Sequence, residues 1–216
     1  MKRGINTKCL HLEDEEGCFD NYGSLSYPIY QTATYAHPAV GESTGYDYSR
    51  LQNPTREHLE KIVAALEDGI DAIALSSGMA AITLLMEIFK PGDHVIVDSD
   101  LYGGSIRLFS NVSEKNNITF SRVDCHKEKV EDYITENTKA IYIETPTNPM
   151  MNVTDIEAMA KIAHERDLLL IVDNTFMSPY FQNPLKLGAD IVIHSGTKYL
   201  SGHNDTCLLY TSPSPR

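Results

Sequence analysis

The sequence predicts an α/β protein built on a mostly parallel sheet with helices on both faces. Short runs rich in Ile and Val, each bounded by Asp, Gly, Ser or Pro, alternate along the chain with longer patterns of helical period. Strands that alternate with helices are typical of right-handed crossovers between parallel strands. The runs are almost continuously apolar, which indicates strands that are buried on both faces.

These patterns set the expected elements in order. Strands are expected at residues 71–77, 93–99, 118–124, 140–145, 168–174 and 190–195. Helices are expected at residues 53–69, 79–90, about 103–116, about 127–136 and 154–166. Asn53 and Pro54 suit the cap and the first position of the first helix. Thr154-Asp155-Ile156-Glu157 fits a capping box for the last one.

Residues 1–52 form an irregular arm before this domain. Tyr, Ser, Thr, Pro and Gly dominate it, and little periodicity is visible. Such a segment is either disordered or ordered by packing on something else. The aromatic residues of YPIYQTATYAHP favour packing, because disordered segments are poor in aromatics. The α/β domain then covers residues 53–205, and residues 206–216 form a tail.

The composition excludes several classes of protein. A formal net charge of −12 argues against a nucleic acid partner, because phosphates need Lys and Arg. No apolar run approaches the roughly 20 residues that span a bilayer, and the N-terminus lacks the apolar core of a signal peptide. We therefore expect a cytoplasmic protein with no membrane partner. The cysteines lack zinc-site spacing, so we expect reduced thiols and no metal site; they are Cys9, Cys18, Cys125 and Cys207.

The residues that follow each strand are the candidate site, because ligands of such sheets bind beyond the carboxyl ends of the strands. Ser76-Ser77-Gly78-Met79 follows the first strand and opens a helix. Small residues there let an anion reach free backbone N–H groups, although a tight packing turn has the same composition. The chain has neither a Walker A motif nor a G-x-G-x-x-G fingerprint, which favours a single phosphate.

Three later strand ends each carry a residue with a functional and a structural interpretation. Tyr102 can stack on an aromatic ligand or pack within the protein. Asn148 can donate from its amide or simply form a turn. Asp173 either caps a loop or requires a cation, such as a protonated ring nitrogen, because a buried unpaired carboxylate is costly.

The last strand is followed by Lys198, near the hydroxyls of Ser195 and Thr197. A phosphate cradle, a stacking ring, an acid for a ring nitrogen and an isolated lysine are together what pyridoxal 5′-phosphate (PLP) requires. The lysine forms the Schiff base, and the acid keeps the ring nitrogen protonated so that the ring can accept electrons. A lysine amine out of water stays nucleophilic near neutrality, so we expect Lys198 to be buried.

Residues 190–204, D-I-V-I-H-S-G-T-K-Y-L-S-G-H-N, resemble the PLP attachment signature of the Cys/Met metabolism (transsulfuration) enzymes. Other stretches resemble motifs of that family in the same order: YSRLQNPT (48–55), SSGMAA (76–81), LYGG (101–104), ETPTNP (144–149) and VDNTF (172–176). The resemblance covers roughly residues 5–205. It implies the large domain of a fold-type I PLP-dependent transferase, with the small C-terminal domain missing.

The resemblance also implies a role for each candidate residue. Lys198 would carry PLP, Asp173 would pair with its ring nitrogen, and Tyr102 would stack on the ring and assist proton transfer. Asn148 would lie near the ring oxygen and the substrate carboxylate. The phosphate would be held within the subunit by Gly78, Met79, Ser195 and Thr197, and from the neighbouring subunit by Tyr48 and Arg50. The arm would therefore pack on a partner in a homotetramer, a dimer of dimers.

The implied activity is β/γ-elimination or γ-replacement on sulfur-containing amino acids or activated homoserine, as in cystathionine γ-synthase or the cystathionine lyases. Lys198 would act as base and acid. Methionine γ-lyase and O-acetylhomoserine sulfhydrylase remain alternatives, and Gly104 disfavours the former, which often carries Cys there. An aminotransferase of the same fold remains open, as does a non-catalytic fragment that binds PLP, another phosphorylated ligand or only a partner chain.

The tail departs from the family resemblance. After residue 205 the chain reads TCLLYTSPSPR, which lacks the expected small-residue strand, and polar TSPSPR predicts no element. The family continues into a domain that supplies an arginine for the substrate carboxylate. We therefore expect a truncated chain whose cofactor site is more complete than its substrate site.

Overall fold

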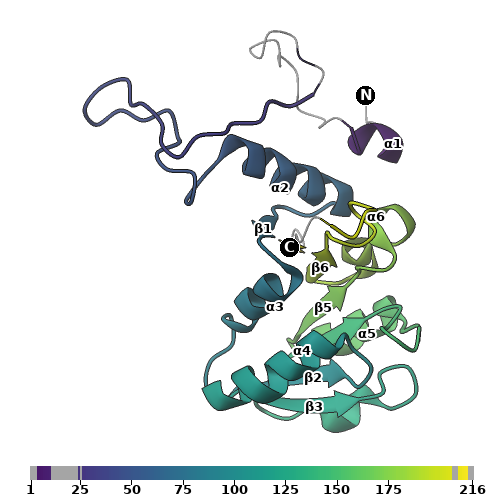
Figure 1. Ribbon diagram of the computed structural model, residues 1–216. Coiled ribbons are helices and arrows are strands. Elements are labelled where there is room, and N and C mark those ends of the chain that lie inside the picture. The colour runs from purple at the N-terminus through teal and green to yellow at the C-terminus, as the bar shows by residue number, and fades with distance from the viewer. Residues whose placement is uncertain (1–3, 11–23, 25, 206–208, 214–216) are drawn as a thin grey trace.

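The computed structural model describes residues 4–10, 24 and 26–205, and the backbone of residues 209–213. Its strands are β1 (Ile73–Leu75), β2 (His94–Asp98), β3 (Thr119–Val123), β4 (Thr138–Glu144), β5 (Leu169–Asp173), β6 (Ile191–Ser195) and β7 (Leu209–Pro213). They form a seven-stranded sheet in the order β1-β7-β6-β5-β4-β2-β3. Strands β6, β5, β4, β2 and β3 are parallel, which confirms the mostly parallel α/β prediction (Figure 1).

Strand β7 corrects the expectation that the tail builds no element. It runs antiparallel to both of its neighbours, and pairs with Ile73–Leu75 on one side and Ile191–Ser195 on the other. Backbone N–H and C=O groups on the facing edges of β1 and β6 need partners, whatever side chains the pairing segment carries. Side-chain polarity was therefore a poor guide to whether this segment pairs.

The helices are α1 (Ile5–Lys8), α2 (Pro54–Glu67), α3 (Gly78–Met86), α4 (Gly103–Leu108), α5 (Ile156–His164) and α6 (Ser178–Phe181). A π-helix (Phe109–Ser113) and a 3-10 helix (Glu114–Asn116) continue α4. Another 3-10 helix covers Pro184–Leu187. Among the residues the structure describes, no helix is long and apolar enough to cross a membrane.

Two local predictions were wrong in detail. The helix expected at 127–136 is only a 3-10 turn at Val130–Tyr133, where Val130 alone is fully buried and offers the sheet no apolar stripe. The capping box was misplaced by one residue. Asp155, not Thr154, accepts the backbone N–H of Ala158, and the N–H of Thr154 instead donates to Thr145 Oγ1 at 3.0 Å.

Apolar clusters cover the two faces of the sheet. Alternation along β4 directs Ile141 and Ile143 to one face and Ala140 and Tyr142 to the other. Helix α5 packs on the first face, and α3 packs on the second together with the region around α4. Glu144 is the last residue of β4 and points to the same face as Tyr142, which is the face that α3 covers. A polar side chain therefore lies on that face at the carboxyl end of the strand.

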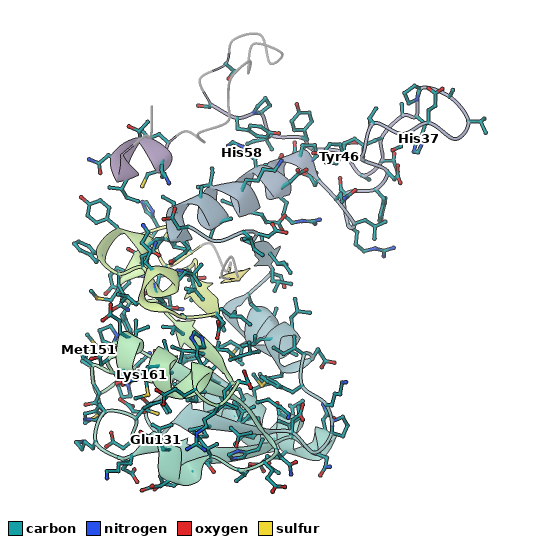
Figure 2. The ribbon with its side chains drawn as sticks, turned by 180° about the vertical axis from the view of Figure 1, so that it is seen from behind. His37, Tyr46, His58, Glu131, Met151 and Lys161 are labelled. Carbon is teal, nitrogen blue, oxygen red and sulfur yellow. The ribbon has the colours of Figure 1, made fainter. Side chains whose placement is uncertain are left out.

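The part of the arm that carries His37 projects as a loop from the start of α2, away from the sheet (Figures 1 and 2), whereas α1 contacts α2. Asn53 ties the arm to the helix. Its Oδ1 accepts the N–H of Thr55 at 2.9 Å, which confirms the predicted cap. Its Nδ2 donates to the Tyr30 carbonyl and to the Tyr35 hydroxyl, both at 3.1 Å. Packing of the arm on a neighbouring subunit stays a prediction.

Two substitutions of Asn53 should separate its role as the cap of α2 from its hydrogen bonds to the arm. We expect Asn53→Ala to lower the free energy of unfolding by about 1–2 kcal/mol, because the helix cap and the arm contacts are both lost. Asn53→Asp keeps the capping oxygen and should lose less than half of that. Urea unfolding followed by circular dichroism measures both. Equal losses for the two variants would show that the cap does not stabilise this junction.

Candidate functional site

A cavity of about 250 Å³ opens at the carboxyl ends of β4, β5 and β6. It collects candidate residues that the sequence placed after separate strands: Gly78, Met79, Tyr102, Asn148, Asp173, Ser195, Thr197 and Lys198. Five further residues line it: Ser77, Ile82, Glu144, Thr175 and Phe176. Tyr48 and Arg50 do not line it.

One end of the cavity is built to receive an anion. Ser77 caps α3 by accepting the N–H of Ala80 at 3.1 Å, so the first N–H groups of the helix, at Gly78 and Met79, have no acceptor within the helix. Ser195, the last residue of β6, lines the same cavity. Helix N-termini attract negative charge through free N–H groups and the helix dipole. The arrangement suits a phosphate.

Asp173 lies at the floor of the cavity and is 7% exposed. Its Oδ1 accepts the N–H of Thr175 at 3.0 Å and the Thr175 hydroxyl at 2.5 Å. No ion pair to it forms within the described part of the chain. Burial raises the pKa of the Asp173 carboxyl, while the Thr175 hydrogen bonds and the charge of His194 act in the opposite direction. A cationic ligand group would remove the desolvation penalty.

Glu144 is a site residue that the sequence reasoning missed, although it begins the quoted motif ETPTNP. It is the direct sheet neighbour of Asp173, with both side chains on the same face. Burial, and then the charge of Asp173, raise the pKa of Glu144 to about 8. Its Oε2 accepts the N–H of Tyr102 at 2.8 Å. Two desolvated carboxyls thus meet at one edge of the sheet.

Thr175 was also missed, and it connects the floor to the phosphate end. Its hydroxyl donates to Asp173 and accepts the backbone N–H of Ser195 at 2.8 Å. The only sequence signal was a hydroxyl residue two positions after the strand-end acid. Such residues are common in turns, and nothing local distinguished this one.

Lys198 lines the cavity but is exposed, which corrects the expectation that it is buried. Its backbone N–H donates to the Ser195 carbonyl at 3.0 Å, and its carbonyl accepts the N–H of Gly202 at 2.8 Å. These bonds fix the turn. Lys198 Nζ makes no hydrogen bond or ion pair with the residues that the structure describes. It stands with Tyr102, which is 44% exposed, on the open side of the cavity.

Gly104 allows Tyr102 to lie where it does. A Cβ at residue 104 would fall 2.4 Å from Tyr102 Cε1 and 2.8 Å from Met79 Sδ. Both distances are shorter than real contacts, so any side chain there, including a cysteine, would displace the Tyr102 ring. The position of the ring over the cavity therefore depends on glycine.

Comparisons with known proteins assign the chain to a family. Residues 6–208 match the profile of the Cys/Met metabolism PLP-dependent enzymes. The chain belongs to that family. A cystathionine gamma-synthase/O-acetylhomoserine (thiol)-lyase from Bacillus subtilis is 56% identical over 210 residues, 95% of this chain and 55% of the relative. A cystathionine gamma-lyase of the same organism is 55% identical over 85% of this chain and 48% of the relative.

A solved structure agrees with the family assignment. The cystathionine gamma-lyase from Lactobacillus plantarum, complexed with L-serine, superposes with a TM-score of 0.93 at 44% identity, over 99% of this chain and 55% of that one. The chain spans about half the length of the curated relatives it matches.

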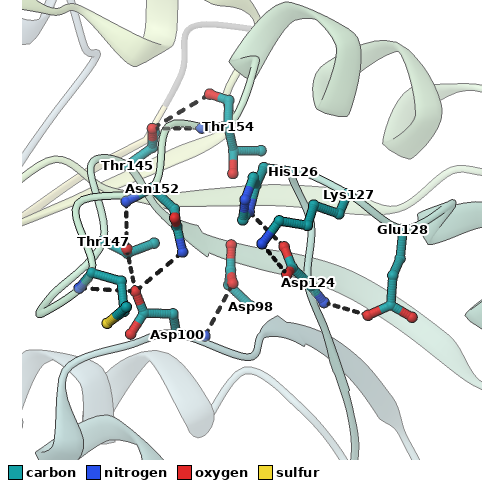
Figure 3. A network of polar contacts seen from close by, with 11 residues as sticks. Asp98, Asp100, Asp124, His126, Lys127, Glu128, Thr145, Thr147, Asn152 and Thr154 are labelled. Carbon is teal, nitrogen blue, oxygen red and sulfur yellow. Dashed lines mark hydrogen bonds and ion pairs between the residues drawn. The ribbon is translucent and has the colours of Figure 1, made fainter.

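In this member of the Cys/Met metabolism family, Asp100 anchors the loop that carries Asn148 (Figure 3). The Asp100 Oδ2 atom accepts the N–H of Met150 at 3.2 Å, the side-chain amide of Asn152 at 3.5 Å and the hydroxyl of Thr147. Asp100 comes two residues before Tyr102. The network therefore fixes the Asn148 loop relative to the segment that positions Tyr102.

The remaining two candidates of this family member lie together on the arm. The Arg50 guanidinium sits 5.1 Å from the centre of the Tyr48 ring, and both residues are exposed. Arg56 donates to the carbonyls of Ser49 at 3.2 Å and Leu51 at 2.5 Å, which holds the backbone on both sides of Arg50. The turn is thus ordered within its own chain, outside the cavity.

Asp98 is a buried acid that lies between Asp100 and Asp124 in Figure 3. It is 2% exposed, its Oδ1 accepts the N–H of Asp100 at 3.1 Å, and its Oδ2 has no partner among the described residues. Burial raises the pKa of the Asp98 carboxyl to about 6. Because the folded-state pKa lies above the unfolded value, folding disfavours the ionised form above pH about 6. That penalty disappears as the pH falls from about 6 towards 4.

Asp98→Asn should therefore stabilise the protein in a pH-dependent way. At pH 7.5 we expect the variant to unfold with about 1–2 kcal/mol more free energy than the parent, after allowing for residual solvent screening, and at pH 4 we expect no gain. Urea unfolding at both pH values measures this. The exposed Asp132→Asn is the control and should show no such dependence. A gain that persists at pH 4 would contradict the ionisation argument.

Proposed function

We propose that this chain binds PLP at the cavity and forms the cofactor-binding part of a transsulfuration enzyme. The activity is β/γ-elimination or γ-replacement on sulfur-containing amino acids or activated homoserine. One observation carries the proposal: Asp173, a buried carboxylate without an ion-pair partner among the described residues, lies in the same cavity as the isolated amine of Lys198. A pyridine ring with a protonated nitrogen and an aldehyde needs both groups in one cavity.

The residues of the cavity fit PLP in charge and in hydrogen bonding. The free N–H groups at the start of α3 and the hydroxyls of Ser195 and Thr197 suit the phosphate. The raised pKa values of the Glu144 and Asp173 carboxyls reflect a site short of positive charge. The protonated ring nitrogen supplies that charge. Tyr102 presents a ring that can cover an aromatic ligand.

Each residue then has a defined duty. Lys198 holds the cofactor covalently and moves protons at the reacting carbons of the substrate. Asp173, oriented by Thr175, accepts the ring N–H. Asn148 contacts the ring oxygen and the substrate carboxylate, and Tyr102 stacks and assists proton transfer. PLP itself supplies an electron sink for the substrate carbanion.

The names of the relatives support both a synthase and a lyase reaction, since they include a gamma-synthase/(thiol)-lyase and a gamma-lyase. Gly104 disfavours a methionine γ-lyase, because those enzymes often carry a cysteine at the matching position. A second candidate, PLP binding without turnover, is favoured by the exposure of Lys198, since proton transfer is most efficient where water is excluded.

We also infer that the site is shared between copies of the chain in a homo-oligomer, a dimer of dimers in the full-length protein. Tyr48 and Arg50 are ordered, exposed and outside the cavity of their own chain. The guanidinium of Arg50 offers forked donors suited to phosphate. Contact with the cofactor phosphate of a neighbouring subunit gives this turn a binding partner.

Borohydride reduction tests the cofactor assignment. Incubation with PLP, reduction and peptide mass mapping should place a phosphopyridoxyl group on Lys198, at about one per chain and at PLP concentrations that leave other lysines unlabelled. Lys198→Ala should abolish this adduct, and Lys186→Ala, whose amine pairs with Asp68 at 3.0 Å, should keep it. Labelling spread evenly over surface lysines would refute the assignment.

Mixing two variants that are each impaired in PLP binding or labelling tests the shared site. Arg50→Ala should lower PLP affinity by about tenfold or more, because a charge-assisted phosphate contact is lost. When Arg50→Ala and Lys198→Ala chains are co-refolded, mixed oligomers regain one complete site, and part of the high-affinity Lys198 labelling should return. No recovery, with mixed oligomers verified by size and mass, would contradict sharing.

A further inference from the structure

Another buried carboxylate, that of Glu67, has no part in the duties proposed above. Glu67, the last residue of α2, is 0% exposed, and His194 in β6 is 1% exposed. His194 Nε2 contacts Glu67 Oε1 directly, across 127 positions of sequence. The amide Nδ2 of Asn174 donates to the same oxygen at 3.3 Å. One atom of α2 therefore meets both strand ends at the floor of the site.

Both partners of Glu67 adjoin residues that are proposed to hold the cofactor. Asn174 directly follows Asp173, and His194 directly precedes Ser195. The last β5–β6 register pair is Asp173 with Ile193, so the regular ladder stops at the cavity. Beyond that pair the N–H of Asn174 donates to the Ile193 carbonyl at 2.9 Å. The side chains of Asn174 and His194 then connect the two strands through Glu67.

The amide of Asn174 is held from a further side. Its Nδ2 donates to the Gln182 carbonyl at 3.0 Å, and its Oδ1 accepts from Gln182 Nε2 at 2.8 Å. Gln182 Nε2 also donates to the Thr145 carbonyl at 3.0 Å. Every polar atom of the Asn174 side chain is thus used, and Glu67 supplies the contact that comes from the helix layer. These hydrogen bonds fix the orientation of the Asn174 side chain directly beside Asp173.

A carboxylate is an unusual choice for joining a helix to a sheet. Burying it is costly, and in the described part of the chain Glu67 Oε2 and His194 Nδ1 have no partner. Val63 of the same helix packs in an apolar cluster with Ala72, just before β1, and with Ala74 of β1, without that cost. Hydrogen bonds differ from apolar contacts in having direction. We therefore expect Glu67 to orient Asn174 and His194 rather than to add to the packing energy between helix and sheet.

We propose that Glu67 is a positioning residue of the cofactor site, which acts through Asn174 and His194 to aim the Asp173 carboxylate at the cofactor's ring nitrogen. The inference rests on the PLP-binding function proposed above. Thr175 transmits the effect, since its hydroxyl links Asp173 Oδ1 to the N–H of Ser195. The phosphate contacts at the start of α3 lie outside this linkage.

Two ligands separate aiming from general packing. One is PLP, and the other is its 1-deaza analogue, in which a C–H replaces the ring nitrogen. Glu67→Gln keeps the shape but weakens the acceptor and buries an extra N–H donor. We expect it to bind PLP about tenfold more weakly than the parent, and the analogue within twofold of the parent. Glu60→Gln, on the same helix but bonded to the Ala74 N–H of β1, should change neither affinity.

His194 variants provide an independent test should the Glu67→Gln chain not fold, as judged by circular dichroism. His194→Gln can still donate to Glu67, and should keep PLP affinity within threefold of the parent. His194→Leu cannot, and should reproduce the loss that is selective for PLP over the analogue. Equal losses of both ligands, or no loss in either Glu67→Gln or His194→Leu, would overturn the inference. Failure of the parent chain to bind PLP would instead refute the proposed function.

Discussion

The structure of the site depends on one unbalanced charge. Asp173 ends a strand that is buried on both faces, where an ionised carboxyl is disfavoured, and it accepts hydrogen bonds from the N–H and the hydroxyl of Thr175. Glu144 adds a second desolvated carboxyl on the neighbouring strand. An edge of this kind is stable only if the acids are partly protonated or if a cation arrives. The first condition agrees with the raised pKa values, and the second describes a binding site for a cationic ring.

The acids of this chain also act as anchors for backbone. Glu144 receives the N–H of Tyr102, and Asp100 receives that of Met150. Carboxylates have several lone pairs and accept strongly, so one acid can hold a loop that no apolar contact reaches. The loops around the cavity therefore take their positions from strand-end acids. Acidic side chains therefore lie close to the end of the cavity that we propose for the phosphate.

The sequence predicted the strands and the residues that converge at their ends, because apolar runs and the rule of the carboxyl edge are local signals. Lys198 and Asp173 were found in that way. Glu67, Glu144 and Thr175 were not, since their importance arises from partners far along the chain: Glu67 meets Asn174 across 107 positions. Strand β7 was not predicted for a related reason: the pairing of its backbone depends on the edges of β1 and β6, which lie far away in the sequence. The exposure of Lys198 depends on what covers the cavity, which a local pattern does not encode.

The contrast between a buried Asp173 and an exposed Lys198 has a chemical consequence. The groups that we propose to hold the ring nitrogen and, within the chain, the phosphate lie at strand ends and at the start of α3, where they line one cavity, so much of the proposed cofactor affinity depends on this part of the fold. Efficient proton transfer at a substrate carbon needs water to be excluded around the amine, and no described segment covers Lys198. Cofactor binding therefore depends on the strand ends, whereas turnover depends on what covers the open side of the cavity. By the inference above, a substitution at Glu67 would affect cofactor binding, whereas turnover would respond to groups that close the open side of the cavity.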